Sequence, residues 1–389
     1  MTRHRFLPSL ARSLAPILSL ALVLAGCGGV DSGGTGGSSA VGPISGLGSI
    51  IVNGVRFDDS AALVTDDDGQ PFPRSRLQLG VLVSVDGSAV SVSGSERLAS
   101  ASRIRVSSDL IGTVQSVDAQ NRSIMVLQQT VRVTAATVFD DQLPSGLGSL
   151  SPGLTIEVYG RTDPATNRYV ATRIELRTAQ GFHAIRGRVD AVGSGTATIG
   201  ATVLDTSGLS AADAALIVPG RVARVRLQPG TLRAVSAVPS ERTLRDSDES
   251  FLEGRITRFD SATSFEVDGQ VVDATRASFP DGASGLGLGR RVSVEGTSRN
   301  GVLRASRVEI EDDEDQATSV FELHGSIEAI NTAARVLQLK GVAVDYSGSV
   351  TFKNGTEGDL ALGRSIEVKG ALQSGGVGLR AQEIKFESN

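Results

Sequence analysis

Apolar and polar residues alternate in short segments along most of the chain. In one such segment Val292 and Val294 are separated by a single polar residue, and Val308 and Ile310 repeat the spacing. This alternation is typical of a β-strand, because successive side chains point to opposite faces of a sheet. Aromatic residues make up only 4% of the chain and Trp is absent, so Val, Ile, Leu and Ala must fill the core. The pattern therefore predicts an all-β protein.

The segment L-x-x-G-x-x-V-x-V-x-G recurs about every 70 residues, which predicts a tandem repeat. Four copies keep the pattern, at residues 77–87, 150–160, 286–296 and 360–370. A third copy in chain order, at 217–227, departs from it because Leu227 stands where the last glycine is expected.

Further landmarks flank each copy of this pattern. An opening G-x-I/V sequence lies upstream and begins with Gly42, Gly112, Gly187, Gly254 and Gly325. A closing strand lies downstream and begins with Ala101, Ala171, Ala305 and Ala381 in four copies. Between them, the pairs Asn53-Gly54, Asp268-Gly269 and Lys340-Gly341 predict type I′ hairpin turns. The third copy has a turn signal at Gly200, and the second has only the weaker sequence Gln128-Gln129.

Each unit thus reads as an opening strand, a two-stranded hairpin, a variable connection, a fourth strand and a closing strand. Five short strands in one flat sheet would leave exposed edges, which closure into a small barrel removes. The strand count, with the longest connection between the third and fourth strands, resembles an OB-like Greek-key barrel. The expected fold class is all-β, a tandem array of five small five-stranded OB-like barrels.

The opening G-x-I, the hairpin, the glycine pattern and the closing A-x-x-I strand together resemble the bacterial domain-of-unknown-function family 5666. The resemblance extends over nearly the whole chain after the amino-terminal region and is weakest in the third copy. It implies tandem domains on an envelope lipoprotein, and it implies no reaction.

The amino terminus resembles a bacterial lipoprotein signal. Arg3, Arg5 and Arg12 precede an apolar run at 14–25, which at about 12 residues is shorter than the roughly 20 that a spanning helix needs. The sequence Leu24-Ala25-Gly26-Cys27 looks like a lipobox, with Cys27 as the lipid attachment residue that carries diacylglycerol and palmitate. Gly28 after the cysteine implies sorting to the outer membrane of a Gram-negative host. The Gly- and Ser-rich residues that follow predict a flexible tether.

These signals divide the chain into seven parts. The expected divisions are a signal peptide at 1–26, a tether at 27–41, and repeats at 42–108, 109–179, 180–240 (divergent), 250–311 and 320–388. Polar and charged linkers are expected at 240–248 and 311–318.

Charge and cysteine content exclude some functions. The formal net charge is −5, and removal of the three signal-peptide arginines would make the mature chain more acidic still. A nucleic-acid-binding protein needs a basic footprint, so no nucleic-acid partner is expected. One cysteine excludes an internal disulfide and a multi-cysteine metal site.

Few residues are candidates for a catalytic or metal-binding site. His183 and His324 have neither a cysteine nor a histidine at metal-ligand spacing. We therefore interpret both as polar residues of a strand rather than as metal ligands or general bases. In Asp66-Asp67-Asp68-Gly69 the acids are contiguous, unlike the alternating acids of a calcium loop, which favours an acidic loop tip over a weak Ca²⁺ site.

Two further runs are weak candidates. The acidic run 311–315 is interpreted as a solvated linker, with divalent-cation binding as the alternative. The glycine-rich run 285–289 lacks the Lys-Ser/Thr pair and the helix of a phosphate loop. No G-x-S-x-G, S-x-x-K or H-E-x-x-H motif is present. We therefore expect no catalytic residue, no metal ligand and no cofactor.

The sequence favours a non-enzymatic, lipid-anchored envelope protein on the periplasmic side or the cell surface. Its barrels would act as a multivalent binding or scaffolding array for an unknown protein or envelope-polymer ligand. The alternatives are an accessory factor in export or assembly of an envelope polymer, and a hydrolase with its site at a domain junction.

Overall fold

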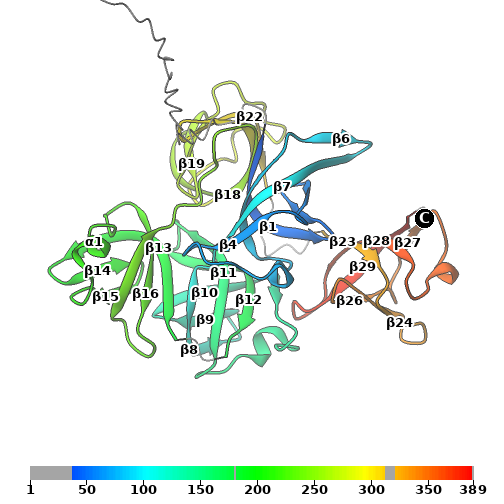
Figure 1. Ribbon diagram of the computed structural model, residues 1–389, viewed down its shortest axis with the longest axis horizontal. Coiled ribbons are helices and arrows are strands. Elements are labelled where there is room, and N and C mark those ends of the chain that lie inside the picture. The colour runs from blue at the N-terminus through cyan, green and yellow to red at the C-terminus, as the bar shows by residue number, and fades with distance from the viewer. Residues whose placement is uncertain (1–36, 179–180, 312–319, 388–389) are drawn as a thin grey trace, which may run out of the picture. The chain divides into compact units, whose positions relative to one another are not determined.

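The computed structural model describes residues 37–178, 181–311 and 320–387, and these residues form an all-β protein (Figure 1). Besides strands they contain only short helical turns, η1 (Arg74–Arg76), η2 (Gly146–Ser149), α1 (Ala211–Ala214) and η3 (Glu357–Asp359). Among the described residues, no helix has the length and apolar character needed to cross a bilayer. The signal peptide and Cys27 lie outside the described residues.

The strands follow the order of the sequence landmarks, and we number the copies 1 to 5 accordingly. Copy 1 contains β1 (Ser38–Leu47), β2 (Ile50–Val52), β3 (Val55–Asp58), β4 (Leu63–Asp66), β5 (Leu82–Gly87), β6 (Ser91–Ser93) and β7 (Glu96–Val106). Copy 2 contains β8 (Leu110–Asp118), β9 (Ser123–Val126), β10 (Gln129–Phe139), β11 (Thr155–Asp163) and β12 (Arg168–Leu176). Copy 3 contains β13 (His183–Gly193), β14 (Thr196–Ile199), β15 (Thr202–Asp205), β16 (Val222–Leu227) and β17 (Ala234–Pro239).

The last two copies repeat this order. Copy 4 contains β18 (Ser247–Ser261), β19 (Ser264–Val267), β20 (Gln270–Asp273), β21 (Arg291–Arg299) and β22 (Val302–Ile310). Copy 5 contains β23 (Phe321–Ser326), β24 (Ala329–Asn331), β25 (Val336–Leu339), β26 (Val342–Asp345), β27 (Thr351–Lys353), β28 (Ser365–Leu372) and β29 (Leu379–Phe386).

Strand pairing closes small five-stranded barrels, as copy 4 illustrates. β18, β19 and β20 pair antiparallel in sequence, β20 pairs parallel with β22, and β21 lies antiparallel to both β22 and β18. Copy 2 has the same closed order. In copy 3 the parallel closure is reduced to one isolated bridge, between Asp205 and Arg233. Closure in this form agrees with the all-β barrel class expected from the sequence.

Strands of different copies also pair with one another. β1 runs parallel to β18 and to β23, and β8 runs antiparallel to β13. In this way copy 1 contacts copies 4 and 5, which are distant from it in sequence. Contacts between copies are therefore not limited to sequence neighbours.

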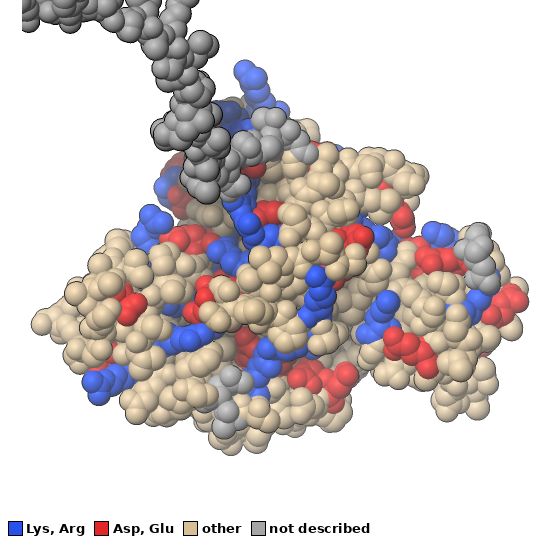
Figure 2. All heavy atoms as spheres, viewed as in Figure 1, with Lys and Arg blue, Asp and Glu red and all other residues tan. Residues whose placement is uncertain are grey.

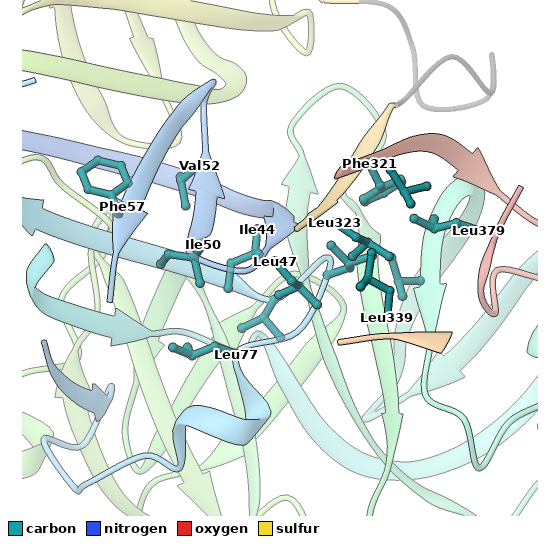
Figure 3. Packing of buried hydrophobic residues seen from close by; sticks show 14 of the residues in the cluster. Ile44, Leu47, Ile50, Val52, Phe57, Leu77, Phe321, Leu323, Leu339 and Leu379 are labelled. Atoms are coloured by element: carbon teal, nitrogen blue, oxygen red, sulfur yellow. The ribbon is translucent and has the colours of Figure 1, made fainter. Parts of the chain in front are cut away.

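The apolar cores follow the same grouping. One cluster includes the interior of both copy 1 and copy 5, a second includes copies 2 and 3, and a third fills copy 4. In Figure 3 the labelled residues of copy 1, such as Ile44 and Leu47, continue into Leu323 and Leu339 of copy 5. Leu47 and Leu323 are register partners where β1 meets β23. The two ends of the repeat array therefore share one apolar interior.

The recurring glycine before the fourth strand has one role in every copy. These residues all have positive φ, at Gly80, Gly153, Gly220, Gly289 and Gly363. The amide of each donates a hydrogen bond to the opening strand, for example from Gly289 to Ile256 O at 2.8 Å. Gly80 donates in the same way to Ile44 O at 2.8 Å. These glycines therefore occupy equivalent turn positions, and glycine adopts this backbone without strain.

The glycine that ends the pattern marks a close approach of two strands. Each of Gly87, Gly160, Gly296 and Gly370 lies at a β-bulge between the fourth strand and the closing strand. A Cβ on Gly296 would lie 2.1 Å from Arg304 O, so a side chain there would displace the neighbouring strand. In copy 3 the bulge lies between Arg226 and Leu227, where the pattern has lost its glycine.

The structure changes several boundaries expected from the sequence. β1 begins at Ser38, so the last residues of the expected tether belong to a buried strand. The expected linker at 240–248 includes Ser240, Arg242 and Leu244, which are all buried. In copy 2 the hairpin turn falls on Leu127 and Gln128, which have positive φ, and Gln129 already lies in β10.

Candidate functional site

His324 lies at the centre of a charged cluster between copies 1 and 5. Its Nδ1 is 2.9 Å from Glu387 Oε1 and its Nε2 is 3.0 Å from Glu322 Oε1. β23 carries His324 and Glu322, and β28 presents Glu367 opposite His324 in register. His324 lies in a strand, as the sequence predicted, and folding surrounds it with carboxylates that the sequence did not indicate.

Four residues of this cluster have the geometry of metal ligands. Glu96, Glu322, His324 and Glu367 each offer a donor atom, and these atoms lie within 4.8 Å of one another. Three carboxylates and one imidazole form a donor set that transition-metal ions accept. The set lies beside a cavity of about 490 Å³ whose walls also carry Lys353, Lys369 and Lys385.

Cations of the chain already neutralise these donors. The Arg56 guanidinium on β3 contacts both Glu322 Oε1 and His324 Nε2. Lys369 and Lys385 bind Glu367 at 3.1 Å and 2.9 Å. Burial alone would raise the pKa of Glu322, but the hydrogen bond with His324 and the charges of Lys369 and Arg56 lower it to about 2. A metal ion would have to displace Arg56, so in this arrangement the cluster is an ion-pair joint between two copies.

A second joint connects copies 1 and 2. Arg76 Nη2 lies 2.9 Å from Glu157, 3.0 Å from Glu175 and 3.1 Å from the Tyr159 hydroxyl. Arg177 also binds Glu157, and Arg173 binds Glu175 at 2.7 Å. Burial raises the pKa of Glu157 to about 7, against the lowering effect of the Arg76 charge.

A third joint connects copies 2, 3 and 4. Arg161 of β11 binds Glu253 of β18 at 3.1 Å and approaches Asp268 at 3.0 Å. Behind them Asp109 Oδ1 lies 3.1 Å from both Arg186 and Arg242. The residues that sequence reasoning set aside as linker and surface therefore form the interior of this joint.

All three joints use equivalent positions of the repeat. His324, Glu253 and Arg186 each stand directly before an opening glycine. Glu157 and Glu367 are the outward residues between two inward positions of the fourth strand. The signal in the sequence was a charge at these outward positions, and it was missed because the partners come from other copies.

The remaining candidates show little chemistry. His183 is buried in β13, and burial lowers its pKa. Asp68 binds Arg224 at 2.5 Å and Arg226 at 2.6 Å, so in the structure the acidic loop tip pairs with copy 3. The glycine-rich run 285–289 forms the turn that leads into β21, and its last amide donates to Ile256 O. Most of the acidic run 311–315 lies outside the described residues.

On the face drawn in Figure 2, acidic and basic side chains are interspersed. This face shows no extended patch of only acidic or only basic side chains. This agrees with the modest net charge of −5 and does not resemble the basic stripe of a nucleic-acid-binding protein.

Comparison with known proteins gives one family. The family model described as Domain of unknown function (DUF5666) matches residues 111–175, 253–309 and 324–385. These segments fall in copies 2, 4 and 5, so the match covers less of the chain than the resemblance in the sequence suggested. Neither a curated protein nor a solved structure matches the chain. The three matches lie inside repeated five-stranded barrels, so copies 2, 4 and 5 are each similar to the DUF5666 family.

Proposed function

We propose that the chain is a non-enzymatic envelope lipoprotein whose tandem barrels form a scaffold or multivalent binding surface. One observation carries this proposal: the side chains best suited to chemistry are bound to arginines of other copies. Glu157 is held by Arg76, Glu253 by Arg161 and Asp68 by Arg224. His324 is likewise contacted by Arg56. Groups held in this way stabilise an assembly of barrels and are not available to a substrate.

The finer features of the fold belong to the same proposal. We count five OB-like barrels, with copy 3 the most divergent, in the domains set out from the sequence. The strand order first, second, third, fifth, fourth and back to first supports this, because it is the closed order expected of an OB-like Greek-key barrel.

The lipid anchor is proposed at Cys27, after cleavage of a signal peptide at 1–26. The protein would then be held in the outer membrane, facing the periplasm or the cell surface. Metabolic labelling with palmitate tests this in a Gram-negative host that expresses the full chain. We expect label on the native protein and none on the Cys27→Ser variant. Equal labelling of both proteins would overturn the anchor.

A binding panel tests the scaffold. The full chain in detergent would be presented with glycans, envelope polymers and Ca²⁺, and both binding and turnover would be measured. Saturable binding without turnover supports the proposal. Catalytic turnover of any glycan that depends on a residue of the joints overturns it.

A hydrolase is the second candidate, and the joint between copies 1 and 2 favours it. A carboxyl group with a pKa of about 7, such as Glu157, can act as a general acid near neutral pH. Glu175 shares Arg76 with it and lines a cavity of about 390 Å³. Glycoside hydrolysis that is lost in Glu157→Gln but retained in Glu309→Gln, an exposed control on β22, would establish this alternative.

A further inference from the structure

Arginines line a cavity of about 500 Å³ at the joint of copies 2, 3 and 4. Three acidic residues also line it, Glu241, Glu266 and Asp268. The six arginines of its walls are Arg161, Arg186, Arg188, Arg221, Arg242 and Arg258. The cavity wall therefore carries more positive than negative charge in a chain whose formal net charge is −5.

The floor of this cavity concentrates like charges. Arg186 and Arg242 are both buried, and both lie 3.1 Å from the same oxygen of Asp109. The Asp109 carboxylate thus forms ion pairs with two guanidinium groups. Burial and the charge of Arg186 lower the pKa of Arg242 to about 10, although Asp109 opposes the change. The charges of Asp67 and Asp268 also act on these arginines, and the pKa of Arg242 remains lowered all the same.

One buried hydrogen-bond donor of Arg242 lacks an acceptor. Arg242 uses both terminal nitrogens, which donate to Gly160 O, Ser107 O and Asp109. Its Nε is buried and has no hydrogen-bond partner among the described residues. A buried donor without an acceptor is costly, and an anion in the cavity would supply acceptors.

An exposed arginine, Arg188, also lines the cavity. Arg221 and Arg258 are paired, with Glu241 at 2.6 Å and Glu266 at 2.8 Å. Arg188 is exposed, and within the described ranges no acidic side chain lies at ion-pair distance from it. Arg188 therefore brings an exposed guanidinium, without an acidic partner in the described part of the chain, to a pocket whose other arginines are paired with carboxylates.

We propose that this cavity binds a phosphate-type oxyanion, either free phosphate or the phosphate group of a small sugar phosphate. Guanidinium groups match the oxygens of phosphate in pairs, and a doubly charged anion offsets a surplus of fixed cations better than a carboxylate. The volume exceeds the needs of a free ion and falls in the range of small-molecule pockets. The inference does not depend on the scaffold proposal.

Calorimetric titration of the full chain in detergent tests the site. The ligands are inorganic phosphate, glucose 1-phosphate and glucose, with chloride at matched ionic strength as the control for screening. We expect saturable binding of a phosphate ligand, none of glucose, and a loss of affinity of about tenfold or more in Arg188→Gln. The matched control is Arg304→Gln, an exposed arginine on β22 outside the cavity, which should keep the affinity.

Each outcome decides the proposal. Tighter binding of phosphate identifies the free ion as ligand, and tighter binding of glucose 1-phosphate identifies the ester; either supports the site. Arg188 is exposed, so its variant should fold, and near-native circular dichroism would show that it does. Absence of saturable binding at millimolar ligand, an equal response to chloride, or unchanged affinity in Arg188→Gln would overturn the proposal.

Discussion

Arg161 of copy 2 and Glu253 of copy 4 form a buried ion pair, with Nη1 3.1 Å from Oε1. The two side chains are 3% and 14% exposed, and Arg291 binds the same carboxylate oxygen at 2.8 Å. Such a carboxylate is tolerated away from water because two guanidinium groups surround it. The pair joins two copies that are not neighbours in sequence.

Replacement of Glu253 by Gln should destabilise the protein by about 3–5 kcal/mol, because it removes the carboxylate charge that Arg161 and Arg291 share in a buried site. Chemical denaturation followed by circular dichroism measures the change. The matched control is Glu309→Gln, whose partner Arg307 is 44% exposed, and it should cost less than about 1 kcal/mol. An equal loss of unfolding free energy in the two variants would show that the buried pair stabilises the protein no more than an exposed one.

The same residue predicts a pH dependence. Burial would raise the pKa of Glu253, but the charges and hydrogen bonds of Arg291 and Arg161 outweigh it and lower the pKa to about 2. A lowered pKa means that the stabilisation is complete above the unfolded value of 4.5 and is lost as pH falls toward 2. Glu253 should account for about 3 kcal/mol of the loss in that window. Unfolding free energies measured from pH 6 downward should therefore fall less steeply for Glu253→Gln, and a parallel fall would contradict the assignment.

The sequence predicted the barrels far better than it predicted the joints. Alternation and glycine spacing depend on contacts inside one copy, and the fourth-strand turn at Gly289 follows from the backbone that this turn requires. The joints depend on which copies meet, and a repeat pattern carries no information about that. His324 illustrates the limit: its partner Glu322 is two residues away in the sequence, but Arg56 comes from the other end of the array. Residues 38–41, which the sequence places in a tether, pair both with β5 of copy 1 and with β18 of copy 4.

The repeated glycine turn predicts a cost from backbone strain alone. Gly363 has φ +78° and a Cβ there would meet no atom within 4 Å, so Gly363→Val should lose about 1–2 kcal/mol through its left-handed backbone. Gly363→Asn should lose less, because Asn tolerates this conformation. Gly348→Val is the control, since its Cβ would also lie in open space and its φ is outside the left-handed region. Thermal unfolding distinguishes the three, and an equal loss in the Gly348 variant would exclude the strain explanation.

Copies 1 and 5 share one apolar interior, so a destabilising substitution in one copy should also destabilise the other. Leu323 is fully buried and lies opposite Leu47 where β23 pairs with β1. Leu323→Ala should cost about 2–5 kcal/mol because it removes side-chain contacts and leaves a cavity that surrounding residues fill only in part. Leu362→Ala is the control, because Leu362 is 70% exposed in the same copy and its loss should cost less than about 0.5 kcal/mol.

Hydrogen exchange measures which strands the Leu323→Ala substitution destabilises. Amide protection should fall in β23 and also in β1, although β1 lies at the other end of the array, and it should remain unchanged in β14 and β15 of copy 3, whose core is separate. Exchange that increases in copy 5 alone would mean that the two copies unfold independently. The pairing of β1 with β23 would then be a surface contact, and the array would behave as a string of separate barrels.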